Sequence, residues 1–208
     1  MADLNEMDLE GDETPDALGT VLIDDRGSLP FAMIHGEALV AAASWALGES
    51  GVLPVDLGTE WAGLVDSGEP VVLHDALCPM TPPSFLAACV SEAVEHQAVV
   101  IGVRPVTDTV KQVVDGFVGT TLDREALVRV CSPVVLPPAV VAAVDLGPTD
   151  LADLAALAAS LRDRFPVRLR EAPPEARRVD SLDDVAALEA LTARSAEGPD
   201  GTAGVSDD

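Results

Sequence analysis

Short runs of apolar residues alternate along this chain with longer stretches whose apolar residues recur every three or four positions. Strands are predicted at residues 21–23, 71–74, 98–103 and 167–170. Helices are predicted at residues 37–47, 84–95 and 151–165, and from residue 181 onward. Continuous apolar runs such as residues 98–103 are typical of strands buried on both faces of a parallel sheet. The alternation predicts an α/β layered fold with a mainly parallel sheet.

The last two predicted helices have the clearest starts. Asp150 is expected to cap the first, and Ser181 followed by Asp184 resembles a capping box at the second. The buried face of the first is predicted to contain Leu151, Leu154, Ala155, Ala158, Leu161 and Phe165. That of the second is predicted to contain Leu182, Val185, Leu188 and Leu191. Between residues 48 and 68 only a short helix near 60–65 is indicated.

The strand at residues 71–74 is followed at once by a carboxylate, Asp75, and by a turn. Beyond this turn, Thr81 is expected to cap a helix and Pro82 to occupy its first position. In an open α/β sheet, ligands bind beyond the carboxyl ends of the strands. Asp75 is therefore a candidate metal or phosphate-site residue. The alternative is that Asp75 only caps the turn.

Composition limits the partners of this chain of 208 residues, whose formal net charge is −24. Residues 1–18 carry seven acidic residues and residues 195–208 carry four, with no basic residue in residues 1–18 and none in 195–208. We expect disordered acidic tails at residues 1–18 and 196–208, around one domain at 19–195. The domain is acidic as well, which argues against a nucleic acid or an anionic membrane as partner.

The three cysteines, Cys78, Cys89 and Cys131, have no metal-ligand spacing. They are interpreted as reduced thiols of a cytoplasmic protein. No signal peptide is recognised, and the most apolar stretch, residues 134–144, contains two prolines and is too short to span a bilayer.

Several segments resemble, in order, the 2-C-methyl-D-erythritol 4-phosphate cytidylyltransferase family, which makes activated polyol phosphates in isoprenoid synthesis. The His-Asp-Ala-Ala-Arg-Pro motif of that family resembles residues 74–79, and its Pro-Val-Thr-Asp-Thr-(Ile/Val)-Lys segment matches residues 105–111 at every position. The remaining similarities are Asp123-Arg124, Ser132-Pro133, Thr149-Asp150 and the segment that begins at Arg178. The resemblance covers roughly residues 70–192. It implies a Rossmann-like nucleotidyltransferase fold of the glycosyltransferase-A type, in which residues of about 104–137 form an inserted β-arm.

The chain departs from the family in the half that binds the nucleotide. Family members carry a Gly-rich loop with an Arg and a Lys, which hold the triphosphate of CTP. Here the corresponding loop is shorter, has one glycine and no lysine, and presents Asp24 and Asp25. Arg26 is a candidate replacement for the family arginine, or a turn residue paired with Asp24 or Asp25. The family segment that reads the cytosine is missing, and Cys78 replaces the motif arginine.

Three functions remain open on this basis. The first is a catalytically degenerate homologue that acts by binding or association. The second is an active enzyme that transfers CMP from CTP to a polyol phosphate. The resemblance then implies that Asp75 holds Mg²⁺ and that the acceptor is bound by Thr109, Lys111, Arg124 and Arg178. The alternative is that these residues remain only as contacts at the end of the sheet and in the arm. The third is a structural or regulatory module recruited through its acidic tails.

The resemblance also implies an assembly. In the family, the arm crosses to a second subunit, and here it contains Val106, Val110, Val113, Val114, Phe117, Val118 and Leu122. A two-stranded ribbon with these side chains is at best marginally stable alone in water. We therefore expect a homodimer, or a heterodimer with a complete homologue, through residues 104–137. The alternative is that the arm folds back on its own sheet.

Overall fold

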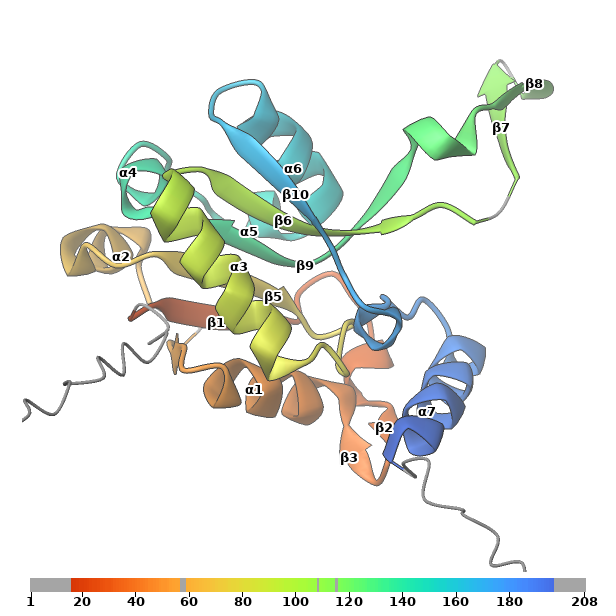
Figure 1. Ribbon diagram of the computed structural model, residues 1–208, viewed down its shortest axis with the longest axis horizontal. Helices are drawn as coiled ribbons and strands as arrows, with labels where there is room; N and C mark the ends of the chain where they lie inside the picture. Colours follow the sequence, from red (N-terminus) through yellow and green to blue (C-terminus); the bar gives the residue numbers. More distant parts are fainter. Residues whose placement is uncertain (1–15, 57–58, 108, 115, 197–208) are drawn as a thin grey trace, which may run out of the picture.

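A six-stranded sheet forms the centre of the protein (Figure 1). The computed structural model describes residues 16–56, 59–107, 109–114 and 116–196. The strands lie in the order β10-β6-β9-β5-β1-β4. Their bounds are β1 Leu18–Leu22, β4 Leu53–Pro54, β5 Val71–Asp75, β6 Val99–Pro105, β9 Val128–Leu136 and β10 Val167–Glu171. Only β9 runs antiparallel to its neighbours, so the predicted mainly parallel sheet is confirmed.

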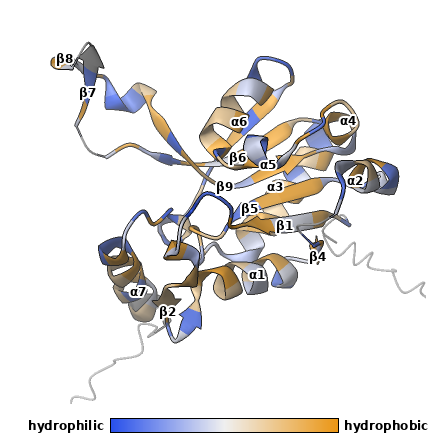
Figure 2. Ribbon diagram, turned by 180° about the vertical axis from the view of Figure 1, so that it is seen from behind, coloured by the Kyte–Doolittle hydropathy of each residue, from blue (hydrophilic) through white to orange (hydrophobic). Residues whose placement is uncertain are grey.

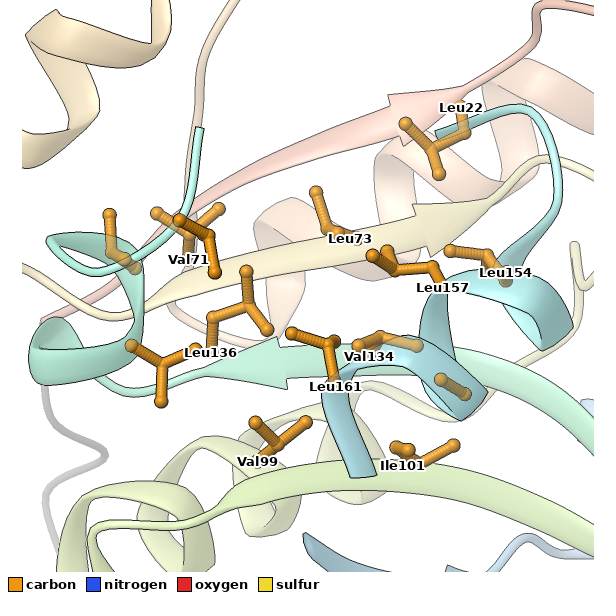
Figure 3. Packing of buried hydrophobic residues seen from close by; sticks show 14 of the residues in the cluster. Leu22, Val71, Leu73, Val99, Ile101, Val134, Leu136, Leu154, Leu157 and Leu161 are labelled. Carbon is orange, nitrogen blue, oxygen red and sulfur yellow. The ribbon is translucent and has the colours of Figure 1, made fainter. Parts of the chain in front are cut away.

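Helices cover both faces of this sheet. They are α1 Leu39–Glu49, α2 Trp61–Ser67, α3 Pro83–His96, α4 Pro138–Val141, α5 Pro148–Leu151, α6 Leu154–Arg162 and α7 Leu182–Ala196. Side chains alternate along β5, so that Val71 and Leu73 pack toward α6, whereas Val72 packs toward α1 and α3. Figure 3 shows the α6 side, where Leu157 and Leu161 lie over the apolar side chains of the strands. The hydrophobic colour along β5, β6 and β9 in Figure 2 matches this two-sided burial.

A third apolar cluster fixes α7 beside the hairpin formed by β2 (Met33–Ile34) and β3 (Glu37–Ala38). Ile34, Leu77, Val185 and Leu188 are buried in it. Two short 3-10 turns flank this region, η1 Leu29–Phe31 before the hairpin and η3 Pro174–Ala176 before α7. The packing of the cluster holds the segment between η3 and α7 against the carboxyl end of β5.

The predicted arm of residues 104–137 differs from the structure in its second half. Residues 128–136 form β9, which pairs with β5 and β6 inside the main sheet because Val134, Val135 and Leu136 are fully buried there. A separate two-stranded sheet consists of β7 (Val110–Val114) and β8 (Phe117–Leu122), followed by the 3-10 turn η2 (Arg124–Ala126). This hairpin projects from the rest of the domain (Figure 1).

Three expectations about the helix ends are wrong. Thr81 does not cap α3: its hydroxyl donates to the Cys78 carbonyl (2.8 Å), and the cap position belongs to Pro82. The helix expected at 151–165 is broken into α5 and α6, because Asp153 accepts the backbone N–H groups of residues 155 and 156 and starts a new helix. Leu182, the first residue of α7, is 67% exposed and is not part of the buried face of that helix, which contains Val185 and Leu188.

Other boundaries shift by a few residues. The predicted tail at residues 1–18 overlaps the fold, because Ala17 is buried and β1 begins at Leu18; residues 1–15 and 197–208 lie outside the described part. In the region expected to contain only a short helix, β4 precedes α2. In the predicted buried face of α6, Ala155 is exposed and Leu157 is buried instead. None of the helices in the described part has the length and apolarity needed to cross a membrane.

Candidate functional site

Asp75 is the last residue of β5 and lies where a parallel neighbour, β1, and an antiparallel neighbour, β9, flank its strand. It is 3% exposed. Its backbone N–H donates to the Ser132 hydroxyl (3.0 Å), and its Oδ1 accepts the backbone N–H of Leu77 (2.9 Å). The carboxylate is thus part of the turn, as one sequence interpretation holds, but its strongest contacts are ionic.

Arg26 reaches this carboxylate from the loop after β1. Its Nε lies 2.7 Å from Oδ1 of Asp75 and its Nη2 lies 3.3 Å from Oδ2, in the two-pronged geometry that favours guanidinium–carboxylate pairs. Nη1 donates to the backbone carbonyl of Asp24. The loop can turn this sharply because Asp25 and Gly27 both have positive φ, of 58° and 59°. The Arg26 side chain is only 3% exposed, so the predicted pairing with an Asp24 or Asp25 carboxylate is replaced by a buried pair with Asp75.

Arg178 completes a triad from the other end of the domain. Its Nε lies 3.3 Å from Oδ2 of Asp75, and its Nη1 contacts the carboxylate of Asp180. A hydrogen bond from the Val179 N–H to the Leu77 carbonyl (2.8 Å) fastens this segment to the turn after β5. Burial lowers the pKa of Arg178, but Asp75 and Asp180 outweigh burial and raise the pKa, so the guanidinium stays charged.

Two further side chains near Asp75 are uncharged. His74 is fully buried, its Nδ1 lies 2.5 Å from the Ser132 hydroxyl, and burial lowers its pKa to about 4 although Asp75 opposes this. The His74 Nε2 finds no hydrogen-bond partner among the described residues. At Cys78, burial and the nearby Asp75 raise the pKa of the thiol well above its usual value. The position of the family arginine therefore carries no charge here.

The remaining predicted residues lie elsewhere. Thr109 and Lys111 lie at the start of the β7–β8 hairpin and are exposed. Arg124 follows β8 and donates to the Thr107 carbonyl (2.8 Å). The hairpin points away from β5 in Figure 1, so a single chain brings together Asp75, Arg26 and Arg178 but not the other three residues. Ser132, quoted in the sequence only as part of a motif, proves to support both His74 and Asp75.

Two cavities flank the triad. One of about 540 Å³ is lined by Asp75, Arg178, Asp180 and Asp153. Another of about 210 Å³ adjoins Arg26. Its charged lining is otherwise acidic: Asp24, Asp56 and Glu60. Anionic phosphates are therefore disfavoured beside Arg26.

The residues present do not fit Mg²⁺. This ion takes carboxylate oxygens into an octahedral shell, whereas both oxygens of Asp75 already accept guanidinium N–H groups. In the described ranges, no cluster of three or more His, Cys, Asp or Glu side chains has an arrangement suited to a metal ion.

Comparison with known proteins identifies the ancestry of this site. Residues 61–192 match the sequence model of the family described as 2-C-methyl-D-erythritol 4-phosphate cytidylyltransferase. The chain belongs to this family. The matched range contains Asp75 and Arg178 but not Arg26, and thus the match to the family model lies in the part of the domain after the loop that bears Arg26.

Individual members of the cytidylyltransferase family match over shorter ranges. The 2-C-methyl-D-erythritol 4-phosphate cytidylyltransferase of Saccharopolyspora erythraea is 34% identical over 138 residues, which are 62% of this chain and 58% of that protein. The bifunctional enzyme IspD/IspF of Nitratidesulfovibrio vulgaris strain DP4 is 43% identical over 72 residues, 35% of this chain and 18% of that protein. The chain thus spans less than two thirds of the length of these relatives.

Solved structures show the same fold. The 2-C-methyl-D-erythritol 4-phosphate cytidylyltransferase of Thermus thermophilus aligns with a TM-score of 0.56 at 20% identity, over 84% of this chain and 98% of that chain. The 4-diphosphocytidyl-2C-methyl-D-erythritol synthase of Anaerococcus prevotii aligns with a TM-score of 0.59 at 13% identity, over 87% and 99%. At these identities the likeness concerns the fold alone.

Proposed function

We propose that this chain is a catalytically degenerate cytidylyltransferase homologue that acts by binding or by association with another protein. The main support for the proposal is that both carboxylate oxygens of Asp75 are paired with arginine side chains. Its two oxygens are shared between Arg26 and Arg178, in a buried triad that leaves no oxygen for a metal and no exposed guanidinium at Arg26 for a phosphate.

Nucleotidyl transfer requires cations that face the phosphates as charge develops in the transition state. For Arg26 to take this role, it has to leave Asp75 and turn toward solvent. Breaking a buried ion pair from one side costs about 3–5 kcal/mol, because the other charge stays buried without a partner. The ion pairs of the structure therefore disfavour any contact between Arg26 and a nucleotide phosphate.

The loop after β1 adds a second obstacle. Asp24 and Asp25 are exposed on it, and Asp24 lines the cavity beside Arg26 together with Asp56 and Glu60. A phosphate about 4 Å from one such carboxylate is disfavoured by about 1 kcal/mol in water and by about 4 kcal/mol in a partly buried site. Several acids in one cavity multiply this cost for a triphosphate.

Binding of CTP tests this proposal without relying on turnover. We expect no saturable heat when the protein is titrated with CTP and Mg²⁺ in a calorimeter, up to millimolar nucleotide. The same titration of the Asp24→Asn variant shows how much the negative charge of this loop lowers the affinity for CTP. Stoichiometric, CTP-specific binding by the unmodified chain contradicts the proposal.

For association, we propose the β7–β8 hairpin as the contact, in a homodimer or in a heterodimer with a complete homologue. Phe117 is 79% and Val118 67% exposed at adjacent positions of β8. As consecutive residues of a strand they face opposite sides of the ribbon, so each side exposes an apolar side chain. Exposed apolar surface on a projecting ribbon is typical of protein–protein contacts. Burial of these side chains against a second subunit also supports a ribbon that is marginally stable alone.

A further inference from the structure

A cavity beside α1, here called the α1 cavity, takes no part in the site at Asp75. It lies between α1, the β2–β3 hairpin and the turn that leads into α3 (Figure 1). Its volume is about 640 Å³, within the range of roughly 300–1,000 Å³ that is usual for small-molecule sites. Among the described residues, none lines both this cavity and the cavity at Asp75.

The walls of the α1 cavity are mainly apolar. One face of α1 contributes Ala41, Ala42 and Ala46, and the turn contributes Pro79 and Met80. The alanine methyl groups are too short to fill the space between the helix and the turn, and thus they leave the hollow. Apolar walls with a few polar groups are typical of sites for small molecules.

Trp45 lines the α1 cavity although 64% of its surface is exposed. Its indole N–H has no hydrogen-bond partner among the described residues. The other tryptophan of the chain, Trp61, instead donates its Nε1–H to the Val141 carbonyl (3.1 Å). The face of an indole ring attracts cations more strongly than the other aromatic side chains do. Trp45 therefore offers the cavity a large apolar surface that also suits a positive charge.

The charge at the α1 cavity is negative. Glu37 lines it, and within the described part of the chain the carboxylate of this residue has no hydrogen bond or ion pair. His35 lines it as well, but its Nε2 contacts the Thr192 hydroxyl of α7 (2.6 Å). No lysine or arginine occurs in residues 27–103, the stretch that supplies the lining. A cation thus meets an unpaired carboxylate here, and the net charge of −24 attracts it from a distance.

The start of α3 offers little to an anion at this cavity. Pro82 and Pro83 stand at the beginning of the helix and have no backbone N–H. The N–H groups of Phe85 and Leu86 donate to the Pro82 carbonyl (3.0 and 3.2 Å). Because helix starts bind anions through free N–H groups, this lining selects against them.

We infer that the α1 cavity binds a small organic cation with an apolar or aromatic body, its ammonium group beside Glu37 and its body against the ring of Trp45. The carboxylate supplies the counter-charge and the ring face adds cation–π attraction. The inference stands whether or not the chain binds CTP, because the cavity shares no lining residue with the one at Asp75 in the described part of the chain.

Calorimetric titration of the full chain at low ionic strength tests the site, with 4-phenylbutylamine as the probe. Neutral 4-phenylbutanol and anionic 4-phenylbutyrate have a similar shape and serve as comparison arms. We expect saturable binding of the amine in the millimolar range or tighter, binding of the alcohol about fivefold weaker, and none of the butyrate. Tryptophan fluorescence should change with the same midpoint as the heat of amine binding, because the probe lies against Trp45.

Variants locate the bound amine. Trp45→Ala is expected to weaken binding about tenfold, whereas Phe31→Ala, which removes a ring that is 61% exposed outside the cavity, should bind as the unmodified chain does. Glu37→Gln is expected to weaken binding about fivefold. Glu49→Gln, an equal change of charge at the exposed end of α1, should not. Ala41→Phe adds a ring at an exposed position of the lining and should abolish binding.

Sedimentation velocity of Trp45→Ala distinguishes a ligand from a second copy of the chain in the cavity. Sedimentation like that of the unmodified chain supports the inference, whereas dissociation of a dimer by this substitution shows that a second subunit covers the cavity and overturns it. The inference is also overturned by the absence of saturable amine binding in the millimolar range, by binding of the alcohol or the butyrate as tight as that of the amine, or by equal affinities of Trp45→Ala and Phe31→Ala.

Discussion

Asp75 is held by two guanidinium groups from distant parts of the chain, Arg26 from 49 positions before it and Arg178 from 103 positions after it. The carboxylate is 4% exposed and the Arg26 side chain 3%. Such a pair stabilises little relative to apolar residues of the same size, but it is costly to break from one side.

Asp75→Asn is therefore expected to lower the free energy of unfolding by about 3–5 kcal/mol, because it leaves Arg26 buried without its counter-charge. Urea unfolding monitored by circular dichroism measures the change. Asp24→Asn, on the exposed surface of the same loop, should change the stability by no more than about 0.5 kcal/mol. Equal, small effects of the two substitutions contradict the buried triad.

The buried His74 predicts that the stability of the protein depends on pH. Its pKa is lowered to about 4 in the folded state, mainly by burial, against about 6.5 in the unfolded chain. Its stabilising contribution is thus complete above pH 6.5 and is lost as the pH falls toward 4. Between pH 7 and 5 this single group removes about 2 kcal/mol of stability.

His74→Gln abolishes this contribution while keeping a polar side chain beside Ser132. The difference in unfolding free energy between pH 7 and pH 5 should consequently be smaller in the variant by about 2 kcal/mol. Identical pH dependences of the two proteins show that His74 is not buried in its neutral form.

The sequence singled out Asp75, Arg26 and Arg178 separately, each through its motif. Their convergence was not predicted, because it depends on a loop that turns through positive φ at Asp25 and Gly27 and on a segment fastened by the Val179–Leu77 hydrogen bond. Neither the periodicity of apolar residues nor the spacing of motifs contains this information.

At the scale of elements, the strands β5 and β6 were predicted within one or two residues because they are continuous or nearly continuous apolar runs. The strand β10, in which Val167 and Leu169 alternate with arginines, was also predicted within one residue. The two-residue strand β4 was missed, since Leu53–Pro54 is too short to form a pattern. The break between α5 and α6 was missed because Asp150 was expected to cap one continuous helix. In the structure Asp153 is the N-cap of α6, whereas Asp150 is the third residue of α5 and its carboxylate accepts the N–H of the cap residue Gly147.

Gly102 shows how two strands position the site. β6 and β9 change register around it, and a Cβ atom at this residue would lie 2.5 Å from the backbone oxygen of Ser132. Gly102→Ala should push Ser132 away from His74 and Asp75 and destabilise the fold by about 1–3 kcal/mol.

Gly48→Ala is the matched control: nothing lies within 4 Å of the added atom in α1, so this substitution is expected to stabilise the protein by about 0.5–1 kcal/mol. Thermal unfolding distinguishes the two, and a neutral Gly102→Ala refutes the close approach.

At the scale of the whole molecule, the projecting β7–β8 hairpin predicts a dimer at micromolar concentration, in sedimentation velocity. Phe117→Asp places a charge on an apolar side chain of the hairpin that is 79% exposed and should yield monomers. Trp45→Asp, a similar change at a 64% exposed side chain of α1, should leave the dimer intact. A soluble monomer that Phe117→Asp does not alter rules this contact out.

The distribution of charge over the molecule agrees with the proposed loss of nucleotidyl transfer. Acids line the cavity beside Arg26, where a triphosphate would need cations, whereas a separate cavity is lined by Arg104, Arg129, Arg177 and Arg178. The domain thus has the fold of the cytidylyltransferases, while most of its arginines lie away from the loop after β1.

Release of pyrophosphate from CTP is the most direct test of the central claim. The full chain is incubated with CTP, Mg²⁺ and 2-C-methyl-D-erythritol 4-phosphate, and pyrophosphate is measured by a coupled assay. With Asp75 held by Arg26 and Arg178, we predict no release above the rate without protein. Turnover at roughly 1 s⁻¹ or faster, in the usual range of enzymes, and its loss in Asp75→Ala would contradict the account.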